Sequence, residues 1–522
     1  MEASGQTPSE LESSPPLETA PMRLLRRLFS FPVMLASVLV VLGMLTVRSR
    51  FDDPDMWWHL KTGQIIWTTH TIPLTDVFSY TTHHQASVPQ EWLAQLSIYA
   101  AYKAGGLSGL MLWLCVLTAI LLIAGYLLCS FYSANCKVAF LGAMTIWLFG
   151  TIGFAIRPQM IGSLLLIVEL LIIHLGRTRN PLWLLWLPVL FALWVNCHGS
   201  FFLGILVAGI FLFSSFFDFR AGSLVAQRWD PQSRRIFALA LILSAAALFL
   251  NPDGMRQILY PINTIFHQPL GLSTSEEWKA TQMTDARGVA LLAVLLCMFL
   301  LVAIRASDIY WDELLLLGLG TWLGVSHLRT LFAFGILAAP TLTRQLSKSW
   351  DEYKPEADRV LPNAILIATA LFVATLAFPG GQNLERQVED QSPAKAVTFL
   401  KNSHLQGPML NDYTYGGYLI WAAPEYPVFV DGRGDVFEWS GILAEFGNWA
   451  TLRSDPNALP NKYGINFCLL SHNSPMAQVM PLMPGWKTIY SDNNSVIFAR
   501  TSSLGQPGKS TGQLQVTGPS QQ

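Results

Sequence analysis

The chain has 522 residues, of which 52% are hydrophobic and 13% are charged, and its mean hydropathy is +0.38. Soluble domains carry about 25% charged residues, so this composition indicates a protein embedded in a lipid bilayer. The formal net charge is −1, and the sequence has no basic stripe. Both features argue against nucleic acid as a partner.

The two ends of the chain differ in composition from the rest. Residues 1–22 are rich in Ser, Pro and Glu, and residues 501–522 are rich in Ser, Gly and Gln. Such segments bury too little apolar surface to fold, and we predict disorder for both. The apolar stretch that follows residue 22 has no small-residue cleavage site, which favours an uncleaved membrane anchor over a signal peptide.

Eleven apolar stretches lie between residues 23 and 380, the region that we predict to be embedded in the membrane. A helix needs about 20 apolar residues to cross the hydrocarbon core. We expect a span near each of 31–48, 107–132, 138–155, 159–175, 182–195, 200–217, 236–250, 288–304, 312–326, 328–343 and 363–379. The segment 91–103 has mixed polarity, and there we expect a helix that lies along the membrane surface.

The positions of Lys and Arg give the predicted spans a direction, because basic residues collect in cytoplasmic loops. With the N-terminus inside, the inner loops hold 15 basic residues, and the longer outer loops before residue 380 hold nine. The same alternation puts residues 381–500 outside the cytoplasm. We therefore predict a multi-pass protein of the cell (inner) membrane with a periplasmic or extracellular C-terminal domain.

Residues 381–500 have the pattern of a small α/β domain rather than that of membrane spans. We expect helices over 392–403 and 442–452, strands over 426–433 and 465–471, and a hairpin over 486–500 that turns at 492–494. The predicted fold class is thus a polytopic α-helical membrane protein with a C-terminal non-cytoplasmic α/β domain.

Seven polar motifs fall on the predicted outer side, in loops that are far apart in the sequence. They are FDDPDMWWHL (51–60), SVPQEW (87–92), IRPQ (156–159), WVNCHGSF (194–201), NPDG (251–254), SEEWK (275–279) and SHLRT (326–330). Each has a structural explanation of its own, such as a solvated loop, a turn, an interfacial aromatic anchor or an arginine that reaches the headgroups. Ionisable residues at membrane depth are costly and usually functional. Their shared side favours one pocket at the outer membrane border.

The residue types in this predicted pocket suit a lipid phosphate. Asp53 and Asp55 are candidate catalytic residues, because a carboxylate can take a proton from an acceptor hydroxyl; they are also the candidate ligands if a divalent metal ion takes part. Arginine makes forked contacts to phosphate, and histidine can add phosphate contacts or acid–base chemistry. The candidates for substrate binding are His59, Glu91, Arg157, Asn196, His198, His327 and Arg329.

At these residues the chain resembles the GT-C superfamily of integral membrane glycosyltransferases, which use polyprenyl-phosphate-linked sugars as donors. The resemblance rests on the many spans, the Asp-bearing first outer loop with surface helices, and the C-terminal domain. It implies inverting transfer of a hexose or pentose, with Asp53 or Asp55 as base or metal partner. Asp52 is the weaker candidate, and Asp55 is preferred.

A second resemblance covers residues 31–500. The motifs DPDMWWHLKTG, QEWLAQ, RPQ, WVNCHGSF, NPDG, NDYTYGGYLIW and YPVFVDGR are similar to those of a bacterial family of uncharacterised multi-span membrane proteins. NDYTYGGYLIW also resembles the acceptor-recognising WWDYG region of oligosaccharyltransferase catalytic subunits, without the tryptophan pair.

Four residues of the C-terminal domain are candidates for acceptor binding. The WWDYG resemblance covers Asp412, Tyr413, Tyr415 and Gly416, and of these it implies Asp412 and Tyr415 as the binding candidates. Asp431 and Arg433 lie at the end of a predicted strand, where functional residues often cluster. Structural turns are the alternative for both pairs.

We therefore predict a membrane glycosyltransferase that transfers a sugar from a polyprenyl-phosphate-linked donor to an acceptor on the outer face of the membrane. The expected partners are the lipid bilayer, the donor and the acceptor. Two alternatives stay open: a non-enzymatic transporter or flippase, and a cell-envelope binding protein with a degenerate GT-C fold. A transporter typically carries polar residues at the membrane midplane, and the predicted spans are nearly free of charge there.

Overall fold

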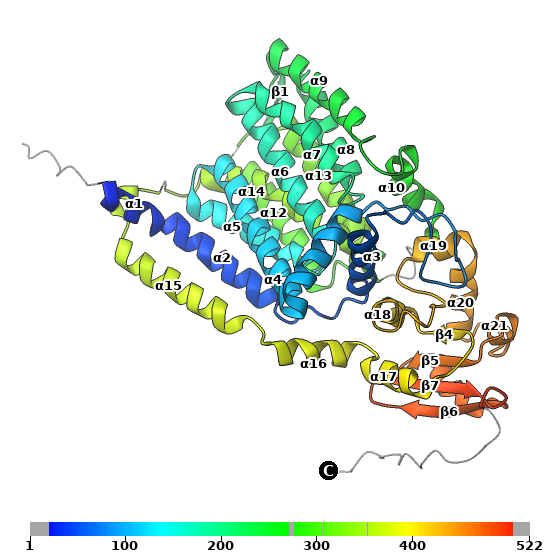
Figure 1. Cartoon of the computed structure of the whole chain (residues 1–522). Helices are drawn as coiled ribbons and strands as arrows, with labels where there is room; N and C mark the ends of the chain where they lie inside the picture. Colours follow the sequence, from blue (N-terminus) through cyan, green and yellow to red (C-terminus); the bar gives the residue numbers. More distant parts are fainter. Residues whose placement is uncertain (1–19, 271–275, 306, 352, 505–522) are drawn as a thin grey trace, which may run out of the picture.

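The computed structural model describes residues 20–270, 276–305, 307–351 and 353–504. Figure 1 shows a bundle of helices and, beside one end of it, a smaller domain that contains a sheet. Most of the two predicted disordered segments, 1–22 and 501–522, lies outside the described residues. The first helix, α1 (Ala20–Leu28), begins at Ala20, and the boundary at residue 22 stays a prediction.

The bundle is built from the helices before residue 380. After α1 they are α2 (Phe31–Val47), α3 (Met56–Thr69), α4 (Trp92–Ser133), α5 (Cys136–Gly150), α6 (Gln159–Thr178), η1 (Pro181–Trp186), α7 (Leu187–Trp194), α8 (Phe201–Ser214), α9 (Pro231–Ala247), α10 (Met255–His267), α12 (Ala286–Arg305), α13 (Trp311–Ser326), α14 (Leu331–Ser347) and α15 (Val360–Ala377). Each of the eleven predicted spans contains a helix.

A membrane body made of many helices is thus confirmed. Among the described residues, five helical stretches are long and apolar enough to cross a membrane: Met22–Val47, Trp92–Ser133, Gln159–Thr178, Ala286–Arg305 and Val360–Ala377. Three others, Cys136–Gly150, Pro181–Trp194 and Phe201–Ser214, are apolar but shorter. The number of spans stays a prediction.

The helix predicted at 91–103 is separate from the span that follows it. The helical backbone of α4 breaks at Gly105 and Gly106, and Gly106 has a φ of 59°, which glycine adopts without steric cost. The part before the break packs closely on α3. A β-carbon at Gly63 of α3 would lie 2.2 Å from the carbonyl oxygen of Gln95.

The loops predicted to lie on the inner side meet one another. The loop after α8 forms β1 (Phe219–Ala221) and β2 (Leu224–Ala226), and β2 pairs with β3 (Ile309–Tyr310) from the loop before α13. Arg177 near the end of α6 forms an ion pair of 2.9 Å with Asp312 at the start of α13. This grouping agrees with the alternation that the basic residues predict.

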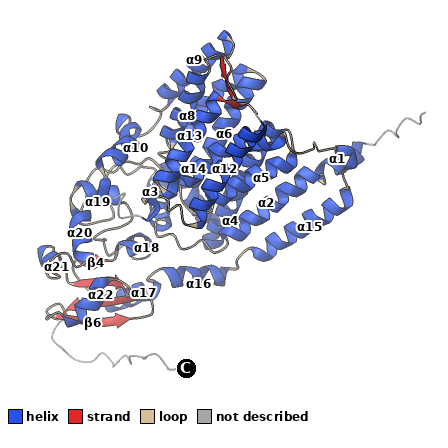
Figure 2. Ribbon diagram, turned by 180° about the vertical axis from the view of Figure 1, so that it is seen from behind, coloured by secondary structure: helices blue, strands red, loops and turns tan. Residues whose placement is uncertain are grey.

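The C-terminal domain is built around a four-stranded sheet in the order β4-β5-β7-β6. The strands are β4 (Met409–Asn411), β5 (Phe467–Ser471), β6 (Trp486–Ser491) and β7 (Ser495–Arg500). β4 is parallel to β5, and the other pairs are antiparallel. Figure 2 shows these strands together at the end of the molecule that lies away from the bundle.

Short helices surround this sheet. They are α16 (Gly381–Gln391), α17 (Ala394–Ser403), η5 (Tyr413–Tyr415), α18 (Gly416–Ala422), α19 (Gly434–Trp439), α20 (Ile442–Ala450), α21 (Ala458–Lys462), α22 (Pro475–Val479) and η6 (Met480–Leu482). The helices predicted over 392–403 and 442–452, the strand over 465–471 and the hairpin over 486–500 are confirmed within three residues.

The strand predicted over 426–433 is wrong. Its only described bridge joins Val428 in parallel to Ser79 of the first outer loop, because its backbone pairs with that loop rather than with the sheet. The amide of Tyr80 donates to the Val428 carbonyl at 3.2 Å, and the amide of Val428 donates to the Phe78 carbonyl at 3.2 Å. Part of the first outer loop therefore belongs structurally to the C-terminal domain.

Candidate functional site

The candidate site begins with an ion pair between the first two outer loops. Arg157, in the turn between α5 and α6, donates from Nε and Nη2 to the two carboxylate oxygens of Asp53, and the Nη2 bond is 2.8 Å long. Only 15% of the Arg157 side chain and 4% of the Asp53 side chain are exposed. This forked geometry is the one in which arginine binds a carboxylate most specifically. It joins the motifs FDDPD and IRPQ.

Two further carboxylates contact the same guanidinium. Nη2 of Arg157 lies 3.2 Å from Oδ2 of Asp55, and Nη1 donates to both oxygens of Glu277 at 3.0 Å. Glu277 lies in η2 (Glu276–Trp278). Arg329, in η3 (Leu328–Thr330), is 3.6 Å from Glu277 and stacks over the Trp278 ring. Residues from four predicted outer loops thus form one cluster.

A cavity of about 180 Å³ opens beside this cluster. Its lining includes three arginines, Arg50, Arg157 and Arg329, and three carboxylates, Asp52, Asp53 and Glu277. Arg50 is held by a bond of 3.1 Å from Nη2 to the Thr151 carbonyl. The arginines are the side chains of this lining that suit an anionic group such as phosphate, and the three carboxylates offset their charge.

Asp55 is placed differently from Asp53. Its carboxylate accepts a hydrogen bond of 3.1 Å from Trp58 Nε1, and Gly432 of the C-terminal domain covers it. Burial raises the pKa of Asp55 to about 6, although Arg157 acts in the opposite direction. A carboxylate with a pKa near the working pH is well matched to take a proton. Asp55, which contacts Arg157 through one oxygen, therefore has the properties of a general base, whereas both oxygens of Asp53 are hydrogen-bonded to Arg157.

A second polar group lies where α3, α4 and the turn before α8 meet. Glu91 is 3.7 Å from Nδ1 of His59 through Oε2 and 3.7 Å from Nε2 of His198 through Oε1. Burial raises the pKa of Glu91 to about 8, lowers the pKa of His198 to about 3, and holds the pKa of His59 well below its ordinary value. At neutral pH all three side chains are therefore uncharged. The carboxyl group of Glu91 can donate a hydrogen bond in this state.

The C-terminal domain contributes Asp435 to the same region. The hydroxyl of Tyr260 on α10 hydrogen-bonds to the Asp435 carboxylate. The charge of Asp435 helps to raise the pKa of Glu91, and the charges of Asp55 and Asp435 help to raise the pKa of Tyr413. The membrane body and the C-terminal domain thus bring acidic groups to one shared interface.

Comparisons with known proteins agree with this architecture. No family model and no curated protein sequence matches the chain. The solved oligosaccharyltransferase of Archaeoglobus fulgidus, tethered with an acceptor peptide, is similar over 91% of this chain and 75% of that chain, with a TM-score of 0.53 and 14% identity. ArnT of Cupriavidus metallidurans, bound to undecaprenyl phosphate, is similar over 91% of this chain and 99% of that chain, with a TM-score of 0.53 and 10% identity. The chain has the GT-C fold.

This similarity confirms the predicted fold class, and the resemblance of the individual motifs stays a prediction. A third solved structure, the Archaeoglobus fulgidus enzyme AglB with an inhibitory peptide and a dolichol-phosphate, covers 90% of this chain with a TM-score of 0.50 and 12% identity. Identities this low show the fold alone. Activity has to be argued from the site, because one fold hosts many functions.

Two predicted substrate-binding residues have close partners within the protein. Asn196 accepts a bond of 2.7 Å from Trp92 Nε1, and its amide donates to the carbonyls of Ala192 and Leu250, each at 2.8 Å. His327 Nδ1 lies 2.7 Å from the Trp278 carbonyl. These contacts hold the GT-C loops that carry Glu91, Glu277 and Arg329.

The four residues predicted to bind the acceptor form two groups. Asp412 caps η5 by accepting from the Thr414 amide at 3.1 Å, and the Tyr415 hydroxyl donates to the Asn494 carbonyl at 2.8 Å. Asp431 and Arg433 form a buried ion pair of 2.6 Å, and Arg433 also reaches Asp76 of the first outer loop at 2.7 Å. Their role in acceptor binding stays a prediction, and their contacts stabilise the domain and its attachment.

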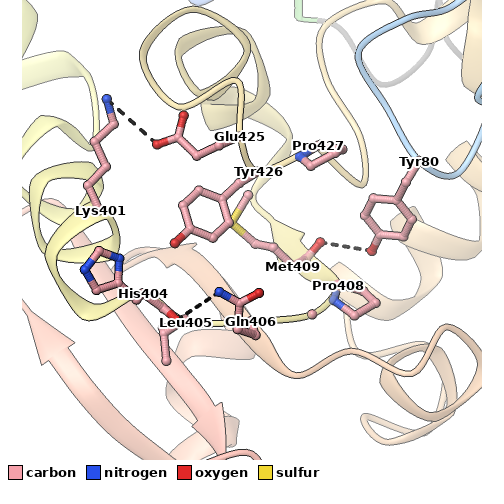
Figure 3. A pocket seen from close by; sticks show the side chains of 11 residues that line it. Tyr80, Lys401, His404, Leu405, Gln406, Pro408, Met409, Glu425, Tyr426 and Pro427 are labelled. Carbon is pink, nitrogen blue, oxygen red and sulfur yellow. Dashed lines mark hydrogen bonds and ion pairs between the residues drawn. The ribbon is translucent and has the colours of Figure 1, made fainter.

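A larger cavity, of about 650 Å³, lies within the C-terminal domain beside the start of β4. Figure 3 shows Tyr426, His404 and Gln406 around it, with Lys401 and Glu425 at one side and Tyr80 at the other. Its lining contains none of the catalytic candidates. It is therefore a separate feature from the carboxylate cluster.

The carboxylates of the site do not fit a divalent metal ion in this arrangement, because the guanidinium of Arg157 lies between Asp53, Asp55 and Glu277. Across the described ranges, no group of three or more His, Cys, Asp or Glu side chains is placed to hold a metal ion.

Several residues at the site were not among the predicted ones. They are Arg50, Glu277, Tyr260 and Asp435. Glu277 belongs to the SEEWK motif, and the position of that motif on the predicted outer side indicated that it could lie near the site. Asp435 follows the candidate Arg433 by two residues. Nothing in the local sequence distinguishes Tyr260 from an ordinary tyrosine of a surface helix.

Proposed function

We propose that this protein is a membrane glycosyltransferase that transfers a sugar from a polyprenyl-phosphate-linked donor to an acceptor on the outer face of the membrane. The observation that carries the proposal is the position of Asp55, a carboxylate with a raised pKa that contacts Arg157 of the arginine-lined cavity and is covered by Gly432 of the C-terminal domain. Two proteins with the same fold support the donor class, since one was solved with undecaprenyl phosphate and the other with dolichol-phosphate.

In the proposed reaction, the oxygen of an acceptor hydroxyl attacks the anomeric carbon of the sugar and its proton passes to Asp55. The bond between the anomeric carbon and the phosphate oxygen breaks, and polyprenyl phosphate leaves. Attack opposite the leaving phosphate inverts the anomeric configuration. Because its pKa is about 6, Asp55 is mostly ionised at neutral pH and is a stronger base than an ordinary aspartate.

The departing phosphate would lie in the cavity beside the cluster. Arg329 is suited to hold it, because its contact with Glu277 is longer, at 3.6 Å, than the contacts that engage Arg157. Arg50 lines the same cavity. Fixed guanidinium groups stabilise the charge that develops on the leaving oxygen.

The acceptor would approach from the interface with the C-terminal domain. Glu91 is protonated at neutral pH and can donate a hydrogen bond to a sugar or acceptor oxygen, with His59 and His198 as neutral neighbours. Asp435 and Tyr413 lie on the domain side of this space. In this proposal Asp431, Arg433, Asp412 and Tyr415 hold the domain over the site.

The proposed sidedness follows from the basic residues. If the N-terminus is cytoplasmic, the cluster and the C-terminal domain lie on the periplasmic or extracellular side of the cell membrane. The convergence of the predicted outer loops at Arg157 and of the predicted inner loops at the β2–β3 pair supports this topology.

The test is an assay of purified protein with a panel of polyprenyl-phosphate sugars, in which release of polyprenyl phosphate is measured. Asp55→Asn should lower the rate by about 10²–10⁴-fold, the usual contribution of a general base, while circular dichroism stays unchanged. Asp285→Asn is the matched control, because Asp285 is an exposed carboxylate on the same predicted side. Full activity in both Asp53→Asn and Asp55→Asn would contradict the proposal.

A further inference from the structure

All three nitrogens of the Arg157 guanidinium contact carboxylate oxygens. Nε and Nη2 contact Asp53, Nη2 also contacts Asp55, and Nη1 contacts both oxygens of Glu277. The three acids come from two segments: Asp53 and Asp55 from the loop before α3, and Glu277 from η2. Like charges this close repel one another strongly unless a cation lies between them.

We propose that Arg157 is the resident cation of this site and takes the position in which a divalent metal ion would otherwise draw Asp53, Asp55 and Glu277 together. Arg157 is thereby a positioning residue: it fixes the two aspartates, and Asp55 acts on the substrate. The chemical meaning of this inference depends on the proposed transfer reaction, but the identity of the cation does not.

The geometry separates this arrangement from a metal site. Divalent metal ions need several oxygen ligands at about 2.0–2.6 Å from one centre, and here that centre lies within the planar guanidinium. Arginine keeps its charge at every accessible pH and cannot dissociate into solvent. A cation of this kind needs no loading, and chelators cannot remove it.

The backbone around Arg157 also favours a fixed cation. The Arg157 amide donates to the Ala155 carbonyl at 2.8 Å in a tight turn, and Pro158 follows at the start of α6. Proline limits the conformations of the residue before it. The side chain is only 15% exposed. Arg157 is therefore restrained at its backbone by the turn and at its guanidinium by the carboxylates.

The arginines of the site have different roles in this arrangement. With its nitrogens engaged by carboxylates, Arg157 contributes charge near the cavity, while Arg329 and Arg50 are placed to contact an anion directly. Arg157 also opposes the rise in the pKa of Asp55 that burial causes. One residue thus orients the base and keeps it ionisable.

The experiment is Mn²⁺ binding to purified protein, measured by electron paramagnetic resonance of the free ion. Wild-type protein should bind no stoichiometric Mn²⁺ at this site. Arg157→Gln removes the cation and leaves three carboxylates facing one another, and their side chains have to move closer together to share one ion. Because their mutual repulsion favours that movement when a cation is offered, this variant should bind about one Mn²⁺ per chain. The double variant Arg157→Gln with Asp53→Asn should lose that site, and Arg256→Gln, which removes an arginine on the same predicted side, should behave as wild type.

Two results would overturn the inference. One is stoichiometric Mn²⁺ binding by wild-type protein that Asp53→Asn abolishes, since the acids would then hold a metal in the presence of Arg157. The other is absence of Mn²⁺ binding by a folded Arg157→Gln protein. If Arg157→Gln does not fold, the wild-type measurement still decides, and Arg157→Lys keeps a point charge that cannot reach all three acids.

A rate measurement adds a second readout once a donor is identified. Wild-type transfer should stay within twofold after chelation of divalent ions, and Arg157→Lys should lower kcat by about 10²-fold through misplacement of Asp55. If no sugar donor reacts, the proposed function fails, while the Mn²⁺ results still report on the cation. The two failures are therefore distinguishable.

Discussion

The backbone of Gly432 lies directly against the carboxylate of Asp55, so that a β-carbon at residue 432 would be 1.9 Å from Oδ1. The C-terminal domain therefore approaches the proposed base at a position where any added side-chain atom would displace the carboxylate. Gly417 makes a similar approach, since a β-carbon there would lie 2.2 Å from the carbonyl oxygen of Pro54. The domain closes over the FDDPD segment through its backbone.

Gly432→Ala should therefore lower transfer by about 10²-fold, because an added methyl group displaces Asp55 from its position. The measurement is kcat for polyprenyl phosphate release, with thermal unfolding recorded in parallel. Gly447→Ala in α20 is the control, since a β-carbon there meets no atom within 4 Å. Equal rates for the two variants would show that the contact between Gly432 and Asp55 has no catalytic effect.

The pH dependence of transfer should report the ionisation of Asp55. The base acts as a carboxylate, so kcat/KM should rise with pH through about 6, the raised pKa of this group. Trp58→Phe removes the hydrogen bond that lowers this pKa, so the rising limb should move to higher pH. Trp57→Phe alters the neighbouring ring and should leave the limb in place. A limb that stays near the pKa of an ordinary aspartate would exclude Asp55 as the base.

Glu91 should make stability depend on pH in the opposite sense to an ordinary salt-bridged acid. Its pKa rises from 4.5 to about 8 on folding, so the folded state binds more protons than the unfolded state between these values. Its contribution is fully present below about pH 4.5 and is lost as pH rises to about 8. The unfolding midpoint of wild-type protein should therefore fall relative to that of Glu91→Gln across this range and level off above it. Parallel curves for the two proteins would contradict a buried, protonated Glu91.

The attachment of the first outer loop to the C-terminal domain should depend on Asp76. This buried carboxylate pairs with Arg433 at 2.7 Å and accepts hydrogen bonds from Ser79 and Thr82. Asp76→Asn leaves Arg433 short of a partner and should cost about 3–5 kcal/mol, seen as faster proteolysis of the C-terminal domain. Glu445→Gln breaks the exposed pair with Lys462 and should cost less than about 1 kcal/mol.

Much of the fold follows from local sequence patterns. Hydropathy alone locates a helix in each of the eleven predicted spans, because the apolar runs are long relative to the loops. The hairpin at 486–500 follows equally well from its turn residues. The segment 426–433 shows the limit, since it alternates like a strand but pairs with residues 78–80, which are about 350 positions earlier in the chain.

The sequence predicts which residues are grouped at the site better than it predicts which of them contact one another. Placing the polar motifs on one side of the membrane is enough to group Asp53, Asp55, Arg157 and Arg329 from the sequence alone. That Arg157 contacts three carboxylates depends on side-chain directions that no local pattern encodes. Asp435 and Tyr260 are in contact because the C-terminal domain packs on α10. A local sequence pattern cannot predict such a tertiary contact.

The pairing of loop 78–81 with residues 428–429 also has a consequence for how the protein is made. Asp76 and Arg433 are separated by 357 positions. At a translation rate of about 5–20 residues per second, Arg433 is therefore synthesised roughly 20–70 s after Asp76. During that interval the aspartates of FDDPD have emerged, but Gly432 has not. The enzyme we propose would thus stay inactive until the last fifth of the chain is synthesised. A nascent or truncated chain would insert into the membrane without using the sugar donor.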